Sequence, residues 1–168
     1  VFIVHARNAW LKGLSPKENR EVPPLRHEFV YRLKRDFPAL TIVLNGGLTA
    51  WTAIEQELAR VDGVMLGRAA YHDPMVLAPV DWRLFANEAP PPSRASVLRA
   101  MVPYVAAQRA RGVPLRSIAR HMLGLYHGMP GGRRFRQILS DAARLKGAGP
   151  ELLEEALAEV EPALDEAA

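Results

Sequence analysis

Residues 41–67 read TIVLNGGLTAWTAIEQELARVDGVMLG, and this stretch decides the fold class. Residues 41–44 form an apolar, β-branched run that predicts a buried strand, and residues 61–66 predict a second strand of the same kind. Between them, residues 50–60 predict a helix with Thr49 as its N-cap. Two apolar strands joined through a helix are typical of parallel pairing in a sheet that is covered on both faces.

The sequence before this stretch adds another unit of the same kind. Residues 1–4 are an apolar run that predicts a further buried strand, and residues 25–36 predict a helix after a long polar loop. Strands that alternate with helices place the first part of the chain in the α/β class. Because three parallel strands are too few for a closed barrel or an ordinary open sheet, we expect residues 1–88 to be the end of a larger α/β domain.

The chain changes character after a proline-rich linker at residues 89–93. We expect residues 94–168 to form an all-α helical bundle with an acidic C-terminal tail, because glycine and proline separate four stretches of helical spacing. The expected helices cover residues 94–111, 115–127, 131–146 and 150–163.

Charge is distributed very unevenly along the chain, although its net value is only +4. Residues 89–140 contain nine arginines and no acidic residue, whereas residues 151–168 contain seven acidic residues and no basic one. A long cationic stretch without compensating carboxylates indicates a polyanionic partner such as a nucleic acid. The alternative is a solvated helix face, for which acidic neighbours are expected.

Composition excludes several classes of protein and site. With 49% apolar and 24% charged residues the chain has the profile of a soluble globular protein, and no apolar run reaches the roughly 20 residues of a membrane span. The chain has no cysteine, which excludes disulfides, thiolate metal ligands and thiol catalysis and fits a cytoplasmic location. We expect no signal peptide, since Val1 opens directly in strand-like sequence. We also expect no metal site, since the adjacent Tyr71, His72 and Asp73 cannot converge on one ion.

Glycine-containing turns follow two neighbouring strands. Asn45-Gly46-Gly47 ends one strand, and Gly67-Arg68 ends the next. Glycine allows backbone N–H groups to approach a phosphate closely, and Arg68 would add a positive charge beside it. The alternative is a pair of ordinary tight turns. Two such turns in adjacent units favour a phosphate site.

His5 ends the first strand, at the edge of the sheet where barrel enzymes collect polar groups. The loop behind it, residues 6–24, is long and basic and contains an aromatic residue, Trp10. Long loops on this edge commonly contact substrate, so we expect the same here. The alternative is a lid that packs on Trp10.

Together these stretches resemble the tRNA-dihydrouridine synthases of subgroup A, in order and in spacing, as far as about residue 146. The stretch at residues 10–20 is the most specific, whereas the glycine turns alone would suit other flavin barrels. The motifs that carry the resemblance are His5-Ala6-Arg7, WLKGLSPKENR at residues 10–20, Asn45-Gly46-Gly47, DGVMLGRAAY at residues 62–71 and GRRFR at residues 132–136.

The resemblance implies a (β/α)8 TIM barrel that binds FMN, with about strands six to eight in residues 1–88, and a helical tRNA-binding domain after it. It implies reduction of uridine to 5,6-dihydrouridine in the D-loop of tRNA, at positions 20 and 20a, with NADPH as the electron donor. The residues that it places around FMN are His5, Asn45, Gly46, Gly47, Gly67 and Arg68. The residues that it places on tRNA are Lys17, Arg20, Arg133 and Arg136.

The chain departs from the family pattern because the cysteine that protonates the uracil ring is missing. We therefore expect a C-terminal fragment that has no catalytic residue of its own, is inactive alone, and self-associates through its open sheet edge. Two other functions stay open at this point. One is a different FMN-dependent barrel oxidoreductase, of the dihydroorotate dehydrogenase type, and the other is a non-catalytic RNA-binding module.

Overall fold

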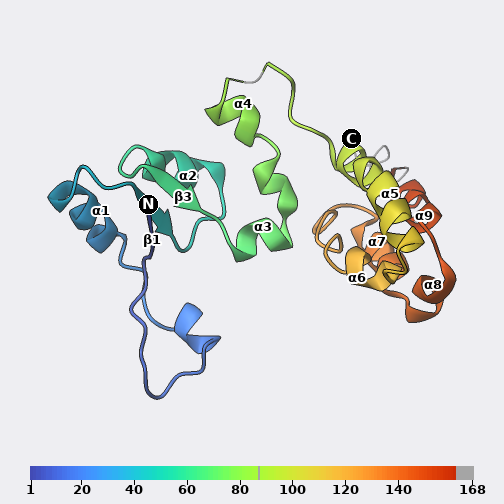
Figure 1. Ribbon diagram of the computed structural model, residues 1–168, viewed down its shortest axis with the longest axis horizontal. Coiled ribbons are helices and arrows are strands. Elements are labelled where there is room, and N and C mark those ends of the chain that lie inside the picture. Colours follow the sequence, from blue (N-terminus) through green and yellow to red (C-terminus); the bar gives the residue numbers. More distant parts are fainter. Residues whose placement is uncertain (87, 162–168) are drawn as a thin grey trace. The chain divides into compact units, whose positions relative to one another are not determined.

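The computed structural model describes residues 1–86 and 88–161 (Figure 1). Contacts between Cα atoms divide the chain into two compact units, the first comprising Val1–Ala70 and the second beginning at Tyr71. We refer to them as the sheet unit and the helical unit, and each is described by itself. The division falls before the proline-rich stretch at residues 89–93 that the sequence suggests as a linker.

The sheet unit is built on three parallel strands in the order β1-β2-β3, as the alternation of strand and helix predicts. The strands are β1 (Phe2–His5), β2 (Ile42–Asn45) and β3 (Gly63–Met65). The register aligns the carboxyl ends, because His5 lies opposite Asn45, and Asn45 lies opposite Met65. The chain is thus α/β with a small parallel sheet.

Two helices pack beside the sheet, α1 (His27–Asp36) against β2 and α2 (Trp51–Leu58) against β3. Leu44 is fully buried, as expected for a central strand, but the expectation of a buried β1 is wrong. Phe2 and Ile3 are 54% and 52% exposed, because β1 has a hydrogen-bonded neighbour on one side only among the described residues.

Short elements fill the remainder of the first half of the chain. A 3-10 turn, η1 (Glu18–Arg20), lies in the long loop between β1 and α1. Helix α3 (Arg68–His72) follows β3, and it is followed by η2 (Pro74–Leu77) and α4 (Val80–Leu84). The expected N-cap, Thr49, is wrong: Ala50 occupies that position and α2 begins without a side-chain cap.

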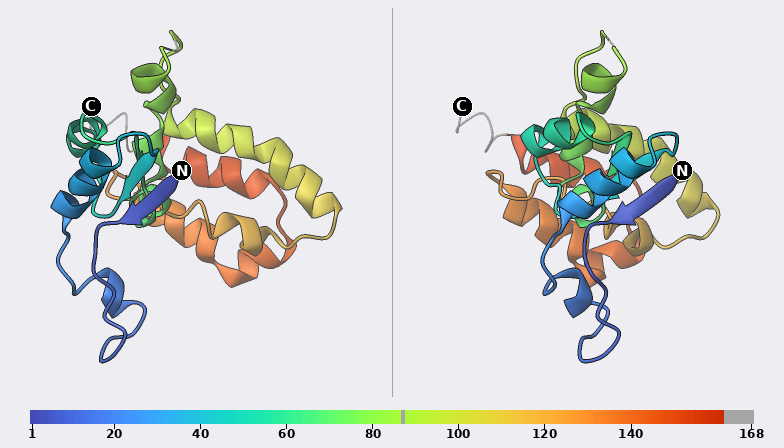
Figure 2. Two further views of the ribbon diagram at one scale, coloured as in Figure 1. Left: turned by 60° about the vertical axis from the view of Figure 1, so that its left-hand side comes forward. Right: turned by 90° about the vertical axis from the view of Figure 1, so that its left-hand side faces the viewer.

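The helical unit continues with α5 (Arg94–Ala110), α6 (Leu115–Ala119), α7 (Gly132–Ser140), α8 (Ala142–Gly147) and α9 (Glu151–Ala158). Figure 2 shows α9 running beside α5, and α9 also packs against α7. These helices share one apolar core, and Phe135 of the GRRFR motif lies inside it. The largest fully buried side chains of this core are Tyr126, Phe135, Leu98, Leu115, Ile138, Leu139, Leu153 and Leu157.

Two of the expected helices are interrupted. The helix expected at residues 115–127 ends at Ala119, and residues 120–128 continue as turns in which Gly124 lies so close to the backbone carbonyl of His72 that a Cβ there would collide with it. The helix expected at residues 131–146 breaks at Asp141, whose backbone is extended and whose carboxylate accepts the N–H of Ala143 at 2.8 Å.

The last expected helix, residues 150–163, is observed as α9 and ends at Ala158, while residues 162–163 lie outside the described part of the chain. In residues 1–86 and 88–161, no helix combines the length and the apolar character that crossing a bilayer requires. The same residues contain no group of three or more His, Asp or Glu side chains arranged to hold a metal ion.

Candidate functional site

The carboxyl ends of the three strands bring the first candidate residues together. The ring Nδ1 of His5 lies 3.2 Å from the backbone carbonyl of Asn45, and the Asn45 side-chain amide lies 3.3 Å from the Met65 sulfur. Because a carbonyl oxygen only accepts hydrogen bonds, Nδ1 of His5 donates in this pair. In the neutral ring, Nε2 is then left as an acceptor at the exposed edge of the sheet.

The turn after β2 requires glycine at two positions. Gly46 and Gly47 have φ angles of +133° and +77°, in the region that side chains disfavour. A Cβ on Gly46 would lie 2.9 Å from Leu25, and a Cβ on Gly47 would overlap the same side chain. Leu25 therefore packs directly on the turn, and a Cβ at either position would have to displace its terminal methyl groups.

Backbone donors of these turns are available to a ligand. Within the part of the chain that the structure describes, the N–H groups of Gly46, Gly47 and Gly67 have no hydrogen-bond partner, although Gly46 is itself buried. Buried or partly buried N–H groups are almost always paired. Unpaired donors at the carboxyl ends of two adjacent strands are suited to hold an anion such as a phosphate.

A hydrogen-bond network between α1 and α2, which the sequence does not predict, holds the turn after β2 in place. His27 places Nε2 3.0 Å from the Gly46 carbonyl and Nδ1 3.3 Å from the Glu57 carboxylate. The same carboxylate accepts the Tyr31 hydroxyl at 2.6 and 2.7 Å. Burial, with Glu57 adding to it, raises the pKa of Tyr31 to about 12. His27 and Tyr31 are one helical turn apart in α1, but no spacing in the sequence links them to Glu57 in α2.

Arg68 lies after β3 at the start of α3, and its guanidinium is engaged by the long loop. It donates to the Glu21 carboxylate at 2.7 Å and to the Arg20 carbonyl at 3.2 Å. The expected positive charge is therefore shared with Glu21. The structure brings Arg68 and Arg20 together, which the sequence does not predict.

The loop that carries Lys17 and Arg20 has a defined internal structure. Asn19 binds the backbone of Trp10 twice, accepting its N–H at 2.7 Å and donating to its carbonyl at 2.9 Å. Ser15 and Glu18 form a capping box, in which the Glu18 carboxylate accepts the Ser15 N–H at 2.7 Å. Hydrogen bonds from the Ser15 hydroxyl and N–H lower the pKa of the Glu18 carboxyl. Lys17 and Arg20 are exposed on the loop so formed.

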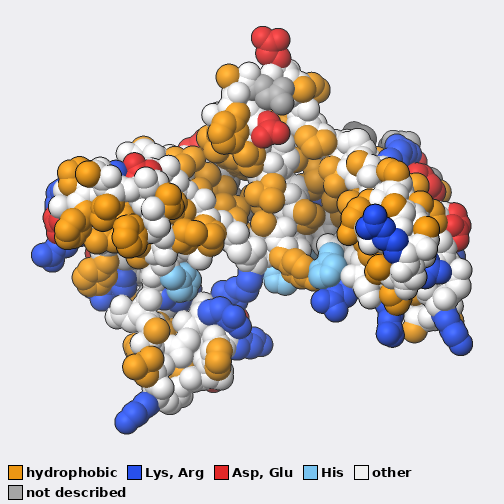
Figure 3. All heavy atoms as spheres, in the orientation of Figure 1, with side chains coloured by type: hydrophobic (Ala, Val, Ile, Leu, Met, Phe, Trp, Pro, Cys, Tyr) orange, Lys and Arg blue, Asp and Glu red, His pale blue; other side chains and the backbone are white. Residues whose placement is uncertain are grey.

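In the helical unit, acidic residues near the C-terminal end sort the arginines into two sets. Arg99 pairs with Glu161 at 2.8 Å, Arg134 lies 3.6 Å from Glu159, and Arg144 pairs with Glu155. A second set has no carboxylate within 4.0 Å among the described residues: Arg109, Arg111, Arg116, Arg120, Arg133 and Arg136. Figure 3 shows Lys and Arg side chains, in blue, standing out from the surface.

The two arginines expected on tRNA, Arg133 and Arg136, are both exposed on α7. Arg136 lines a pocket of about 320 Å³ together with Arg120 and His121. Arg120 Nε lies 3.2 Å from His121 Nε2, and His121 Nδ1 lies 3.1 Å from the Tyr71 hydroxyl. Since arginine only donates, Nε2 of His121 accepts, and in the neutral ring Nδ1 donates to Tyr71.

Comparison with known proteins identifies related sequences. The family model described as dihydrouridine synthase (Dus) matches residues 1–161. A tRNA-dihydrouridine(20/20a) synthase of Xanthomonas axonopodis pv. citri is 59% identical over 157 residues, which are 94% of this chain and 46% of the relative. Proteins of the same name from Yersinia pestis and Synechocystis are 50% and 51% identical, over 96% and 93% of this chain and 47% of each relative.

This chain spans about half the length of the curated relatives that it matches. The family model covers residues of both the sheet unit and the helical unit. The chain therefore belongs to the dihydrouridine synthase family.

Proposed function

We propose that this chain is the C-terminal part of a flavin-dependent tRNA-dihydrouridine synthase that reduces uridine to 5,6-dihydrouridine at positions 20 and 20a of the tRNA D-loop. The observation that carries the proposal is the pair of glycine turns, whose N–H groups are unpaired at the carboxyl ends of β2 and β3, within a chain of the matching family. In this proposal residues 1–88 belong to a TIM barrel and residues 94–168 to a helical tRNA-binding domain.

The cofactor assigned here is FMN, with NADPH as the reductant, and the residues present fit a flavin phosphate. The N–H groups of Gly46, Gly47 and Gly67 would bind the phosphate, with Asn45 and Arg68 beside them. His5 would contact the flavin through the Nε2 that its bond to Asn45 leaves as an acceptor. Bound flavin supplies hydride transfer to the pyrimidine ring.

The chain's own residues hold and orient the two ligands. His27, fixed by Glu57, donates to the Gly46 carbonyl and keeps the turn in shape. Four basic residues would bind phosphates of the tRNA backbone and so orient the tRNA. They are Lys17 and Arg20 on the loop between β1 and α1, and Arg133 and Arg136 on α7. The target base must leave its stack to reach a flavin, which requires such fixed backbone contacts. With no cysteine in the chain, the proton donor to uracil is assigned outside residues 1–168, and this chain alone is inactive.

The test uses the longer protein that contains this chain. Purified, it should carry one FMN per chain and, with NADPH, form dihydrouridine at positions 20 and 20a of tRNA. Gly46→Ala should lose flavin, because the new Cβ meets Leu25, whereas Gly147→Ala should not, since nothing lies within 4 Å of that position. A colourless protein that forms no dihydrouridine would refute the proposal.

A further inference from the structure

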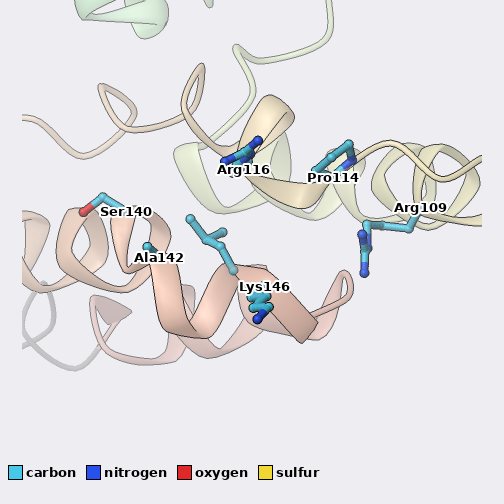
Figure 4. Close-up of a pocket in the computed structure, with 7 residues that line it drawn as sticks. Arg109, Pro114, Arg116, Ser140, Ala142 and Lys146 are labelled. Atoms are coloured by element: carbon cyan, nitrogen blue, oxygen red, sulfur yellow. The ribbon is translucent and has the colours of Figure 1, made fainter.

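A second cationic pocket lies in the helical unit, apart from Arg133 and Arg136. It has a volume of about 500 Å³ and is formed by the end of α5, by α6, and by the segment from the end of α7 through α8. Figure 4 shows Arg116 and Lys146 on opposite walls, with Ser140 toward one end and Arg109 toward the other. Leu145 and Pro114 supply apolar lining.

The charge of this pocket is of one sign. Three of its lining residues are basic, and no acidic residue lines it. Arg109, Arg116 and Lys146 have no carboxylate within 4.0 Å among the described residues, whereas the α9 side of the same unit pairs its arginines with glutamates. The neighbouring carboxylate of Asp141 is occupied by the N–H groups of Ala143 and Arg144. The unneutralised cations are thus left to an external anion.

Two arginines at α6, Arg116 and Arg120, relate this pocket to Arg136, which is already assigned to RNA. Arg116 and Arg120 lie four residues apart at α6 and its C-cap, a spacing at which side chains are neighbours on one helix face. Arg120 in turn shares a pocket with Arg136. A row of cations therefore runs from Lys146 through Arg116 and Arg120 to Arg136. One molecule with regularly spaced negative charges would match such a row.

From this arrangement we infer that the pocket between α6 and α8 binds a backbone phosphate of the bound RNA through Arg109, Arg116 and Lys146. The inference rests on the proposed tRNA substrate and extends its binding surface beyond α7. Phosphodiester oxygens accept hydrogen bonds from arginine and lysine alike. The apolar lining leaves room for the attached ribose.

The first test measures the tRNA affinity of the longer protein that contains this chain, across a salt series. Each lost phosphate contact lowers the slope of log affinity against log salt by about 0.7 to 0.9. Arg116→Ala with Lys146→Ala should therefore flatten the slope by about 1.5. The matched control is Arg99→Ala, which removes an arginine that is already paired with Glu161 and should leave the slope unchanged.

The second test uses lysine acylation read by mass spectrometry. Lys146 is the single lysine after Lys34, and it is exposed in the free chain. Bound tRNA should protect Lys146 from acetylation at least several-fold, while Lys34, held by Asp62 at 2.8 Å, should react equally with and without RNA. If tRNA binds with an Arg133- and Arg136-dependent slope but leaves Lys146 reactive, this inference alone is wrong. If the protein binds no tRNA at all, the assignment of tRNA binding to the helical domain is wrong as well as this inference. Formation of dihydrouridine by the longer protein tests its enzymatic activity separately.

Discussion

At Gly47 a single methyl group decides whether the turn after β2 can form. Its φ of +77° disfavours any side chain, and a Cβ there would overlap Leu25. Gly47→Ala should lower the free energy of unfolding by about 1 to 3 kcal/mol, measured by urea denaturation. Gly67→Ala is the matched control: nothing lies within 4 Å of its Cβ position, so its effect should stay within about 0.5 kcal/mol. Equal effects of the two substitutions would mean that neither the positive φ of Gly47 nor its contact with Leu25 limits stability.

Tyr31 should make stability depend on pH in the alkaline range. Its pKa of about 12 in the folded chain exceeds the ordinary tyrosine value of roughly 10, so the unfolded chain releases this proton first. The stabilisation is complete below pH 10 and is lost as the pH rises through 12. The loss should amount to roughly 1 to 2 kcal/mol.

Tyr31→Phe should remove the decrease in the free energy of unfolding that Tyr31 causes between pH 10 and 12. Urea unfolding at several pH values measures this. Tyr104→Phe is the control, since Tyr104 is half exposed and its variant should keep the wild-type profile. A profile that both variants leave unchanged would exclude Tyr31 as its origin.

The sequence predicts which candidate residues lie at the strand ends, but not the side-chain contacts between residues far apart in the chain. His5, Asn45, Gly46 and Gly47 stand at strand ends, and parallel pairing alone brings them to one edge. The brace behind them joins His27 to Glu57, thirty residues away, through side chains that no periodicity connects. Only the packing of α1 beside α2 creates that contact.

Among the elements, strands were predicted better than helices. Each strand lies within two residues of its predicted bounds, because short apolar runs ended by glycine or asparagine have few alternatives. The helix expected at residues 115–127 ends early, and the turns that follow Ala119 place Gly124 against the backbone carbonyl of His72. That contact joins residues far apart in the sequence, so helical periodicity alone does not predict it.

Asp141 converts what would be one helix into α7 and α8. Its carboxylate accepts the N–H groups of Ala143 and Arg144, and it serves as the N-cap of α8. Asp141→Ala should therefore lower thermal stability by about 1 kcal/mol. Asp141→Ser, which keeps a capping oxygen, should recover most of the loss in the same calorimetric experiment. No recovery by serine would mean that the carboxylate acts by its charge and not as a cap.

At the scale of the whole molecule, we expect the exposed edge of the sheet to determine whether the chain associates with itself in solution. β1 presents Phe2 and Ile3, each about half exposed, beside an edge without a strand partner among the described residues. Unpaired strand edges and apolar surface drive association, so the chain should self-associate at micromolar concentration in light scattering.

Ile3→Lys should shift this chain toward the monomer, because a charge at an edge strand opposes edge-to-edge pairing. Leu11→Lys changes an even more exposed apolar residue, 95% accessible, outside the sheet and should have no such effect. A monodisperse wild-type monomer would contradict the expectation, and equal shifts by both variants would point to general hydrophobicity.

The loop between β1 and α1 has a consequence for the thermodynamics of partner binding. Hydrogen bonds within the loop, from Asn19 to the Trp10 backbone and between Ser15 and Glu18, are already present in the free chain. Its backbone rotations are therefore already restricted in the free chain, and a partner that meets Lys17 and Arg20 has little left to immobilise there. Recognition through this loop would then resemble the docking of a rigid body, with a small entropic penalty and nearly the same loop conformation before and after.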